Sequence, residues 1–94
     1  MFKVLTISVM PPRRQKPRLV ALIWEDIAPH DGSWVERTSV KPQPAIMESV
    51  GWLILDDNKY VILAQDLDFK DDMVAGLATY PRGCVQSLTY IGEN

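Results

Sequence analysis

A chain of 94 residues, 47 % hydrophobic and 23 % charged, is long enough for one compact core, too short for two, and too apolar to be disordered throughout. Its net charge of −2 is uneven: residues 1–18 hold five basic and no acidic side chains, whereas residues 19–94 hold five basic and twelve acidic ones. A body of −7 repels nucleic acid unless its basic residues gather on one face, as a ring of subunits could arrange. With one cysteine, no recognisable targeting segment and no apolar run of bilayer length, we expect a cytoplasmic protein with no membrane partner.

The chain opens with a weak strand signal over residues 2–9, where apolar and polar residues partly alternate. The following stretch, 11–18, has three prolines, which remove backbone donors and interrupt regular structure. Residues 1–18 are therefore predicted to form a strand and a basic arm outside the main domain, 19–94. Arg13 and Arg14 in this arm are candidates for phosphate contact. The alternative is a solvated linker broken by its prolines.

Residues 19–27 are apolar on both faces and predict a strand in the middle of a sheet or barrel. Residues 28–33 contain proline, Asp-Gly and serine, a combination typical of a turn. Pro42 and Pro44 exclude a long helix over residues 34–47, so we expect an extended excursion there, with one helical turn near Trp34.

Residues 48–67 predict a hairpin with arms at 50–55 and 60–65, joined by turn residues at 56–59. An acidic loop over 68–73 follows, and then two more strands, 74–80 and 84–91, separated by Pro-Arg-Gly. Short strands with turns at short spacing predict an all-β fold, a small barrel or sandwich.

Few residues are candidates for catalysis. His30 lies in a predicted turn and Cys84 in a predicted strand, and nothing brings them together. The acidic loop lacks the central glycine and terminal glutamate of an EF-hand loop, and the five glycines form no phosphate-binding pattern. We therefore expect no enzyme activity, no metal and no cofactor. The three tryptophans, Trp24, Trp34 and Trp52, are interpreted as packing residues or as a stacking platform for bases.

Two short motifs resemble the Sm-like (LSm/Hfq) family. In the first, Gly51, Leu53 and Asp57 have the family spacing and precede an apolar strand at 60–63. The second is the tight basic turn within residues 80–88, around Arg82-Gly83. The chain departs from the family at Val61, where an asparagine is usual, and in its N-terminal segment and its 34–47 insertion.

This resemblance implies a five-stranded, strongly bent Sm-like (SH3-like) barrel that assembles into a homo-oligomeric ring of about five to seven subunits. It also implies single-stranded nucleic acid as a ligand, with RNA favoured over DNA. The residues that would bind it are Asn58, Lys59, Tyr60 and Arg82.

A second set of residues, Trp24-x-Asp26-Ile27, Asp31 to Trp34 and Pro81 to Val85, resembles a group of small phage and marine metagenomic proteins. One such group, of cyanophage type, is Sm-like and ring-forming, which implies a location inside an infected bacterium. Two alternative functions stay open: a phage accessory protein that captures a small nucleotide or a host protein between subunits, and a structural assembly component without a ligand.

Overall fold

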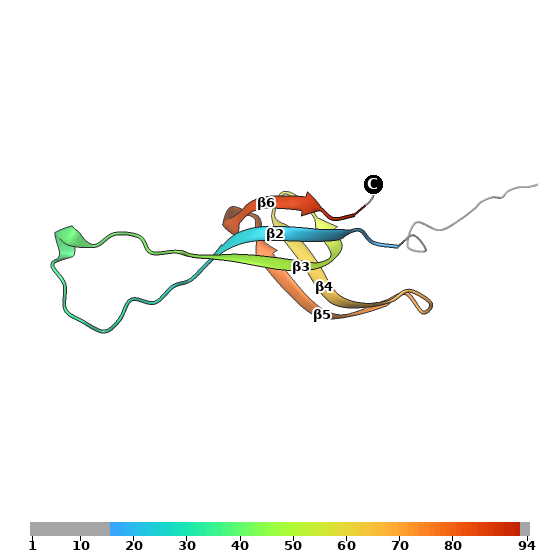
Figure 1. The fold of residues 1–94 in the computed structure, drawn as a ribbon, viewed down its shortest axis with the longest axis horizontal. Helices are drawn as coiled ribbons and strands as arrows, with labels where there is room; N and C mark the ends of the chain where they lie inside the picture. The colour runs from blue at the N-terminus through green and yellow to red at the C-terminus, as the bar shows by residue number, and fades with distance from the viewer. Residues whose placement is uncertain (1–15, 93–94) are drawn as a thin grey trace, which may run out of the picture.

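The computed structural model describes residues 16–92 and shows an all-β protein (Figure 1). The predicted strand over 2–9, together with Arg13 and Arg14, lies outside the described residues. The regular elements of the described residues are five strands and two short 3₁₀ turns, in the order β2 (Leu19–Asp26), η2 (Arg37–Ser39), β3 (Ala45–Asp56), β4 (Tyr60–Asp68), β5 (Met73–Pro81), η3 (Arg82–Cys84) and β6 (Val85–Tyr90).

All five strands belong to one antiparallel sheet with the order β5-β4-β3-β2-β6. β2 lies between β3 and β6, which confirms the internal position predicted from its apolar sequence. β5 and β6 are the two edges and do not pair with each other, so the described sheet is not closed into a barrel. Within the described range, no helix is long and apolar enough to cross a membrane.

The core is small, and its cluster of buried hydrophobic side chains comes from β2, β4 and the end of β5: Val20, Leu22, Val61, Leu63 and Tyr80. Ala64 is also buried but is not part of this cluster, because it follows Leu63 on β4 and successive strand residues point to opposite faces. Trp24 closes one side, because its ring meets the Tyr80 ring edge-on at a centroid distance of 4.9 Å and its indole Nε1 donates to Ser49 Oγ at 3.0 Å. The indole is therefore half-buried with its polar atom satisfied.

Gly51 lies where β3 approaches β4 most closely. A Cβ at this position would stand 2.9 Å from the Ala64 carbonyl oxygen and 3.2 Å from Leu63 Cβ, so only glycine fits without a shift of the backbone. Just beyond it, the register between β3 and β4 shifts between Leu53 and Leu55. An irregularity of this kind bends a strand and increases its twist.

The strand bounds differ from the predicted ones mainly in length. β3 begins at Ala45, well before residue 50, because its first residues pair with the second half of β2. β4 continues to Asp68 along β5, which places the first residue of the predicted acidic loop in a strand. Cys84, expected inside a strand, ends η3 and is half-buried.

The excursion between β2 and β3 is extended, as the prolines predicted. Its one helical turn is η2, three residues after Trp34. In Figure 1 this long loop stands away from the sheet on the left.

Candidate nucleic-acid interface

The turn between β3 and β4 is organised by one carboxylate. Asp57 Oδ1 accepts hydrogen bonds from the backbone N–H of Lys59 at 2.8 Å and of Tyr60 at 2.7 Å. The Asp57 N–H in turn donates to the Tyr60 carbonyl at 3.0 Å. These backbone donors, Tyr60 first and Lys59 second, hold the pKa of Asp57 below its usual value, with a smaller contribution from the positive charge of Arg82. The turn is therefore fixed while Asp57 is ionised.

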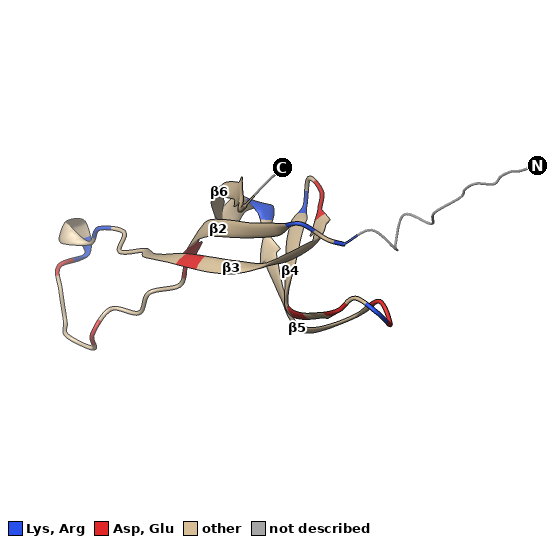
Figure 2. Ribbon diagram, turned by 45° about the vertical axis from the view of Figure 1, so that its right-hand side comes forward, with Lys and Arg blue, Asp and Glu red and all other residues tan. Residues whose placement is uncertain are grey.

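Arg82 is joined to this turn from another part of the chain. Tyr60 pairs with Pro81 in the β4–β5 ladder, so Arg82 follows directly beside the turn. Its backbone N–H donates to the Lys59 carbonyl at 2.8 Å, and its guanidinium Nη2 lies 3.0 Å from Asp56 Oδ1. The two motifs that resemble those of the Sm-like family thus meet at one end of the sheet (Figure 2).

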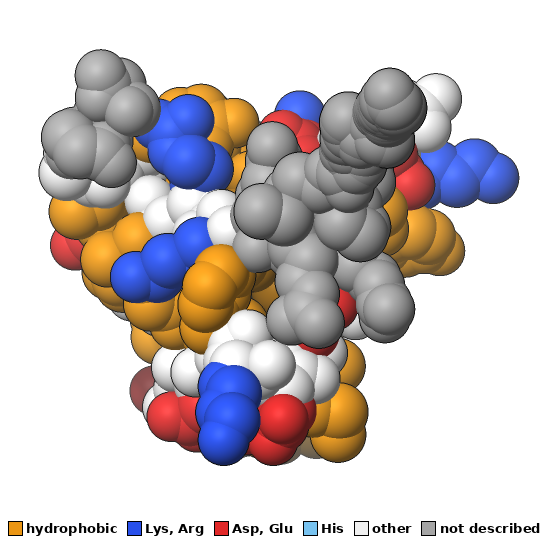
Figure 3. Space-filling view, turned by 90° about the vertical axis from the view of Figure 1, so that its right-hand side faces the viewer, with side chains coloured by type: hydrophobic (Ala, Val, Ile, Leu, Met, Phe, Trp, Pro, Cys, Tyr) orange, Lys and Arg blue, Asp and Glu red, His pale blue; other side chains and the backbone are white. Residues whose placement is uncertain are grey.

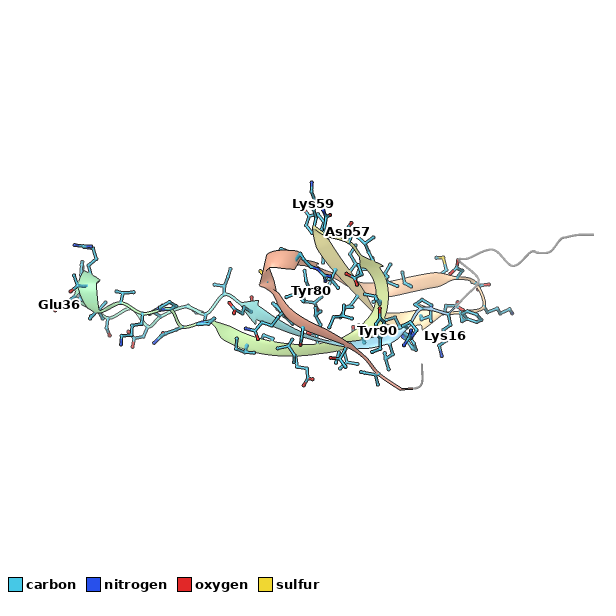
Figure 4. The ribbon with its side chains drawn as sticks, turned by 90° about the horizontal axis from the view of Figure 1, so that it is seen from above. Lys16, Glu36, Asp57, Lys59, Tyr80 and Tyr90 are labelled. Carbon is cyan, nitrogen blue, oxygen red and sulfur yellow. The ribbon has the colours of Figure 1, made fainter. Side chains whose placement is uncertain are left out.

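Four of the predicted binding residues are brought together here: Asn58, Lys59, Tyr60 and Arg82. All four are exposed, and the Tyr60 side chain is 45 % accessible. Lys59 makes no ion pair within residues 16–92 and points outward beside Asp57 (Figure 4). An exposed aromatic ring with two cations at the same turn offers a surface on which a base can stack and positive charges for phosphates. Val61, at the family's asparagine position, is fully buried and is unable to contact a ligand.

Arg82 also lines a groove along β6. This groove has a volume of about 500 Å³ and is lined by Asp56, Arg82, Val85, Gln86, Ser87, Leu88 and Tyr90. Tyr90, which belongs to this lining, also contacts Arg18, whose guanidinium carbon lies 4.2 Å from the centroid of the Tyr90 ring. The groove therefore contains one arginine and an aromatic ring that a second arginine covers.

Arg18 and Tyr90 were not predicted as binding residues. The sequence did indicate Arg18 as a possible phosphate contact, because it is the last cation of the basic arm. Its stacking on Tyr90 depends on the pairing of β2 with β6 and could not be predicted from the sequence. Lys16 lies similarly over Trp52, 4.8 Å from the ring centroid. Figure 3, which views this end of the molecule, shows basic side chains lying against hydrophobic ones.

Comparison with known protein families, with curated proteins and with solved structures finds no significant match to this chain. The functional argument therefore depends on the geometry described above.

Proposed function

We propose that this protein is an Sm-like, ring-forming protein that binds single-stranded nucleic acid, RNA in preference to DNA, through the turn cluster of Asn58, Lys59, Tyr60 and Arg82. The observation that supports this most directly is the hydrogen bond from the Arg82 N–H to the Lys59 carbonyl, which fastens the second motif to the first. Two segments more than twenty residues apart thereby present one exposed ring and two cations at the same end of the sheet.

The chemistry of the cluster fits an unpaired strand. Tyr60 offers a face on which a base can stack without sequence preference, and Lys59 offers a mobile charge for phosphate. Arg82 is partly neutralised by Asp56, since the two side chains form an ion pair. A phosphate must compete with that carboxylate, so Lys59 and Tyr60 carry more of the proposed affinity than Arg82.

A ring would solve the charge problem of the body. One subunit presents its two cations on a domain of −7, but copies arranged around an axis would bring several such turns together. The edges β5 and β6 are suited to this assembly, because within residues 16–92 each has an unpaired side that a neighbouring copy could extend by strand addition. Closure of the sheet into an Sm-like barrel is part of the same proposal.

The test is fluorescence anisotropy of the full chain with labelled single-stranded RNA and with DNA of the same sequence. Lys59→Glu and Tyr60→Ala should each weaken binding about tenfold or more, because each removes a charge contact or a stacking surface. The matched control is Lys70→Glu in the turn between β4 and β5, which makes the same charge change at an exposed site outside the cluster.

Equal loss in the Lys70→Glu control would mean that net charge, and not the cluster, governs binding. Wild-type affinity in both cluster variants would overturn the proposed site. An Arg82→Glu variant that bound as well as wild type would remove Arg82 from it.

A further inference from the structure

The long loop between β2 and β3, residues 27–44, has no cover from its own domain. Every residue from 29 to 44 is exposed, and η2 is its only regular element. Trp34 near its tip is fully accessible, at 101 %, and Val35 and Val40 are 64 % and 55 % accessible. Glu36, labelled in Figure 4, lies at the end of the molecule farthest from the sheet. Loops of this length without structure of their own are commonly functional.

The domain also has an unfilled hollow, of about 330 Å³. It is lined in part by Val50 on β3, Leu63 and Gln65 on β4, and Gly76, Ala78 and Tyr80 on β5. The hollow exists because β3 pairs with β4 only from Trp52 to Asp56, so that the earlier part of β3 separates from the β4–β5 hairpin. Its lining is partly polar and partly apolar, and its volume is large enough for one indole ring.

We propose that Trp34 occupies this hollow in a second copy of the chain, and that two copies exchange their long loops reciprocally. The hollow lies at the base of the loop, since Ser49 in its lining is four residues past Ala45, where the loop returns to the sheet. A two-fold axis through the middle of two antiparallel loops therefore brings each tip to the base of the other. By symmetry both contacts form together.

The charges favour this antiparallel arrangement. The base of the loop is acidic, with Glu25, Asp26 and Glu48 and no basic residue anywhere in β2 or β3. The loop itself, residues 27–44, is neutral, with Arg37 and Lys41 against Asp31 and Glu36. Figure 2 shows acidic residues where the loop leaves the sheet, and both basic and acidic ones farther out. Antiparallel exchange places Arg37 and Lys41 beside the acidic base, whereas a parallel arrangement places the two acidic bases together.

The area of such an interface would come mainly from the loops. Two indoles that each bury about 150–250 Å² supply roughly 300–500 Å². A specific interface needs about 1,200–2,000 Å² in total. The two extended loops, each exposing Val35 and Val40, must supply the remainder.

This association uses none of the nucleic-acid cluster, and it does not need the unpaired backbone of β5 or β6, although part of the lining of the hollow comes from side chains of β5. It doubles whatever assembly the domains build by themselves, so a monomer becomes a dimer and a ring becomes a pair of rings. Its failure is consequently separate from a failure of nucleic-acid binding.

The test is the native mass of the full chain over a dilution series, by light scattering or native mass spectrometry. Trp34→Ala and Val50→Glu should each halve the native mass and raise the dissociation constant at least about tenfold. Val50 is 57 % exposed, so the substitution leaves the fold intact. The matched control, Phe69→Glu, changes a 48 % exposed residue of the β4–β5 turn, outside the hollow and outside the edge strands, and should keep the wild-type mass.

A charge exchange tests the antiparallel register. Arg37→Glu should weaken the doubling, and adding Glu48→Arg to the same chain should restore it. Unchanged native mass in both Trp34→Ala and Val50→Glu would overturn the proposal. A wild-type native mass at high concentration that is not an even multiple of the chain mass would also overturn it. The loop would then bind a partner other than a second copy of this chain.

Discussion

Asp57 has a structural task at the centre of the proposed binding turn. It lies in the solvent-exposed β3–β4 turn, yet its carboxylate holds the backbone of the two residues that would contact the ligand. Its contribution to binding is therefore indirect, through the placement of Lys59 and Tyr60.

We predict that thermal stability at neutral pH follows the order wild type, Asp57→Asn, Asp57→Ala. The amide keeps one acceptor oxygen but loses the charge that strengthens its hydrogen bonds, and alanine loses both. Differential scanning fluorimetry of the three proteins checks the order. An alanine variant as stable as wild type would show that the turn holds without this side chain.

The lowered pKa of Asp57 fixes the direction of the pH effect. A carboxyl group whose pKa is lower in the folded state stabilises the protein at pH above its unfolded value, and this stabilisation is lost as the pH falls through the folded value. The difference in melting temperature between wild type and Asp57→Ala should therefore be present at pH 7 and shrink in acid. A difference that grew in acid would contradict the assignment.

Two glycines, Gly51 and Gly32, allow the effect of close packing on stability to be distinguished from the effect of backbone flexibility. We predict that Gly51→Ala destabilises the protein by about 1–3 kcal/mol, because its Cβ would meet the backbone of β4 at 2.9 Å. Gly32→Ala is the control, since nothing lies within 4 Å of its Cβ, and it should be neutral within about 0.5 kcal/mol. Urea unfolding of both variants measures the contrast, and equal effects would mean that the close approach at Gly51 relaxes without cost.

At this scale the sequence predicted some residues well and others not at all. The turn preferences of Asp57 and Asn58 are local, so they could be read directly, although neither residue adopts the left-handed conformation that such residues tolerate. Gly51 was identified by its spacing. The Arg82–Asp56 ion pair, the Lys59–Arg82 backbone bond and the Arg18–Tyr90 stacking join distant segments, and each depends on strand register. No single-sequence pattern encodes that register.

At the scale of elements, β2 is the strand on which the core depends most. It pairs with β3 on one side and β6 on the other, and it contributes the fully buried Val20 and Leu22. Only six hydrophobic side chains of the described residues are buried, so each is a large part of the core.

Leu22→Ala should accordingly cost about 2–5 kcal/mol, a large share of the roughly 5–15 kcal/mol of a small domain. Leu77→Ala on β5 is the control, because Leu77 is 58 % exposed and the same change there should cost about 0.5 kcal/mol or less. Urea midpoints at one protein concentration compare the two. Similar midpoints would show that the buried face of β2 is not the centre of the core.

The existence of each described strand was predictable because apolar runs alternate with turn residues. The ends were less so. Ala45 to Met47 were expected to belong to the excursion, since Pro42 and Pro44 precede them, but pairing with Trp24 to Asp26 extends β3 back to Ala45. Tertiary pairing thus overrides a local signal, as is usual for strands.

Within residues 16–92, the molecule presents two unpaired sheet edges, a mainly acidic surface and a basic turn. An unprotected strand edge promotes association with another copy, whereas the acidic charge of a subunit opposes the binding of nucleic acid. Association and nucleic-acid binding therefore make opposite demands on a single subunit. Assembly into a ring reconciles them, because it pairs the edges and repeats the turn around an axis. The oligomeric state is therefore the property on which the largest part of the functional proposal depends.

We predict that the purified chain has a ring-sized native mass and that nuclease treatment lowers both this mass and the ratio of absorbance at 260 nm to that at 280 nm. Nucleic acid carried through purification would account for the loss of both signals together, whereas a ring without it would keep both. Such a clean ring would favour the small-ligand or the structural alternative. The control is the Lys59→Glu variant, which should keep the ring mass, since residue 59 lies in a turn and not on an edge strand, while it loses the nuclease-sensitive absorbance. A monomer before and after digestion would contradict the ring, and with it the argument that neighbouring turns combine into one basic surface.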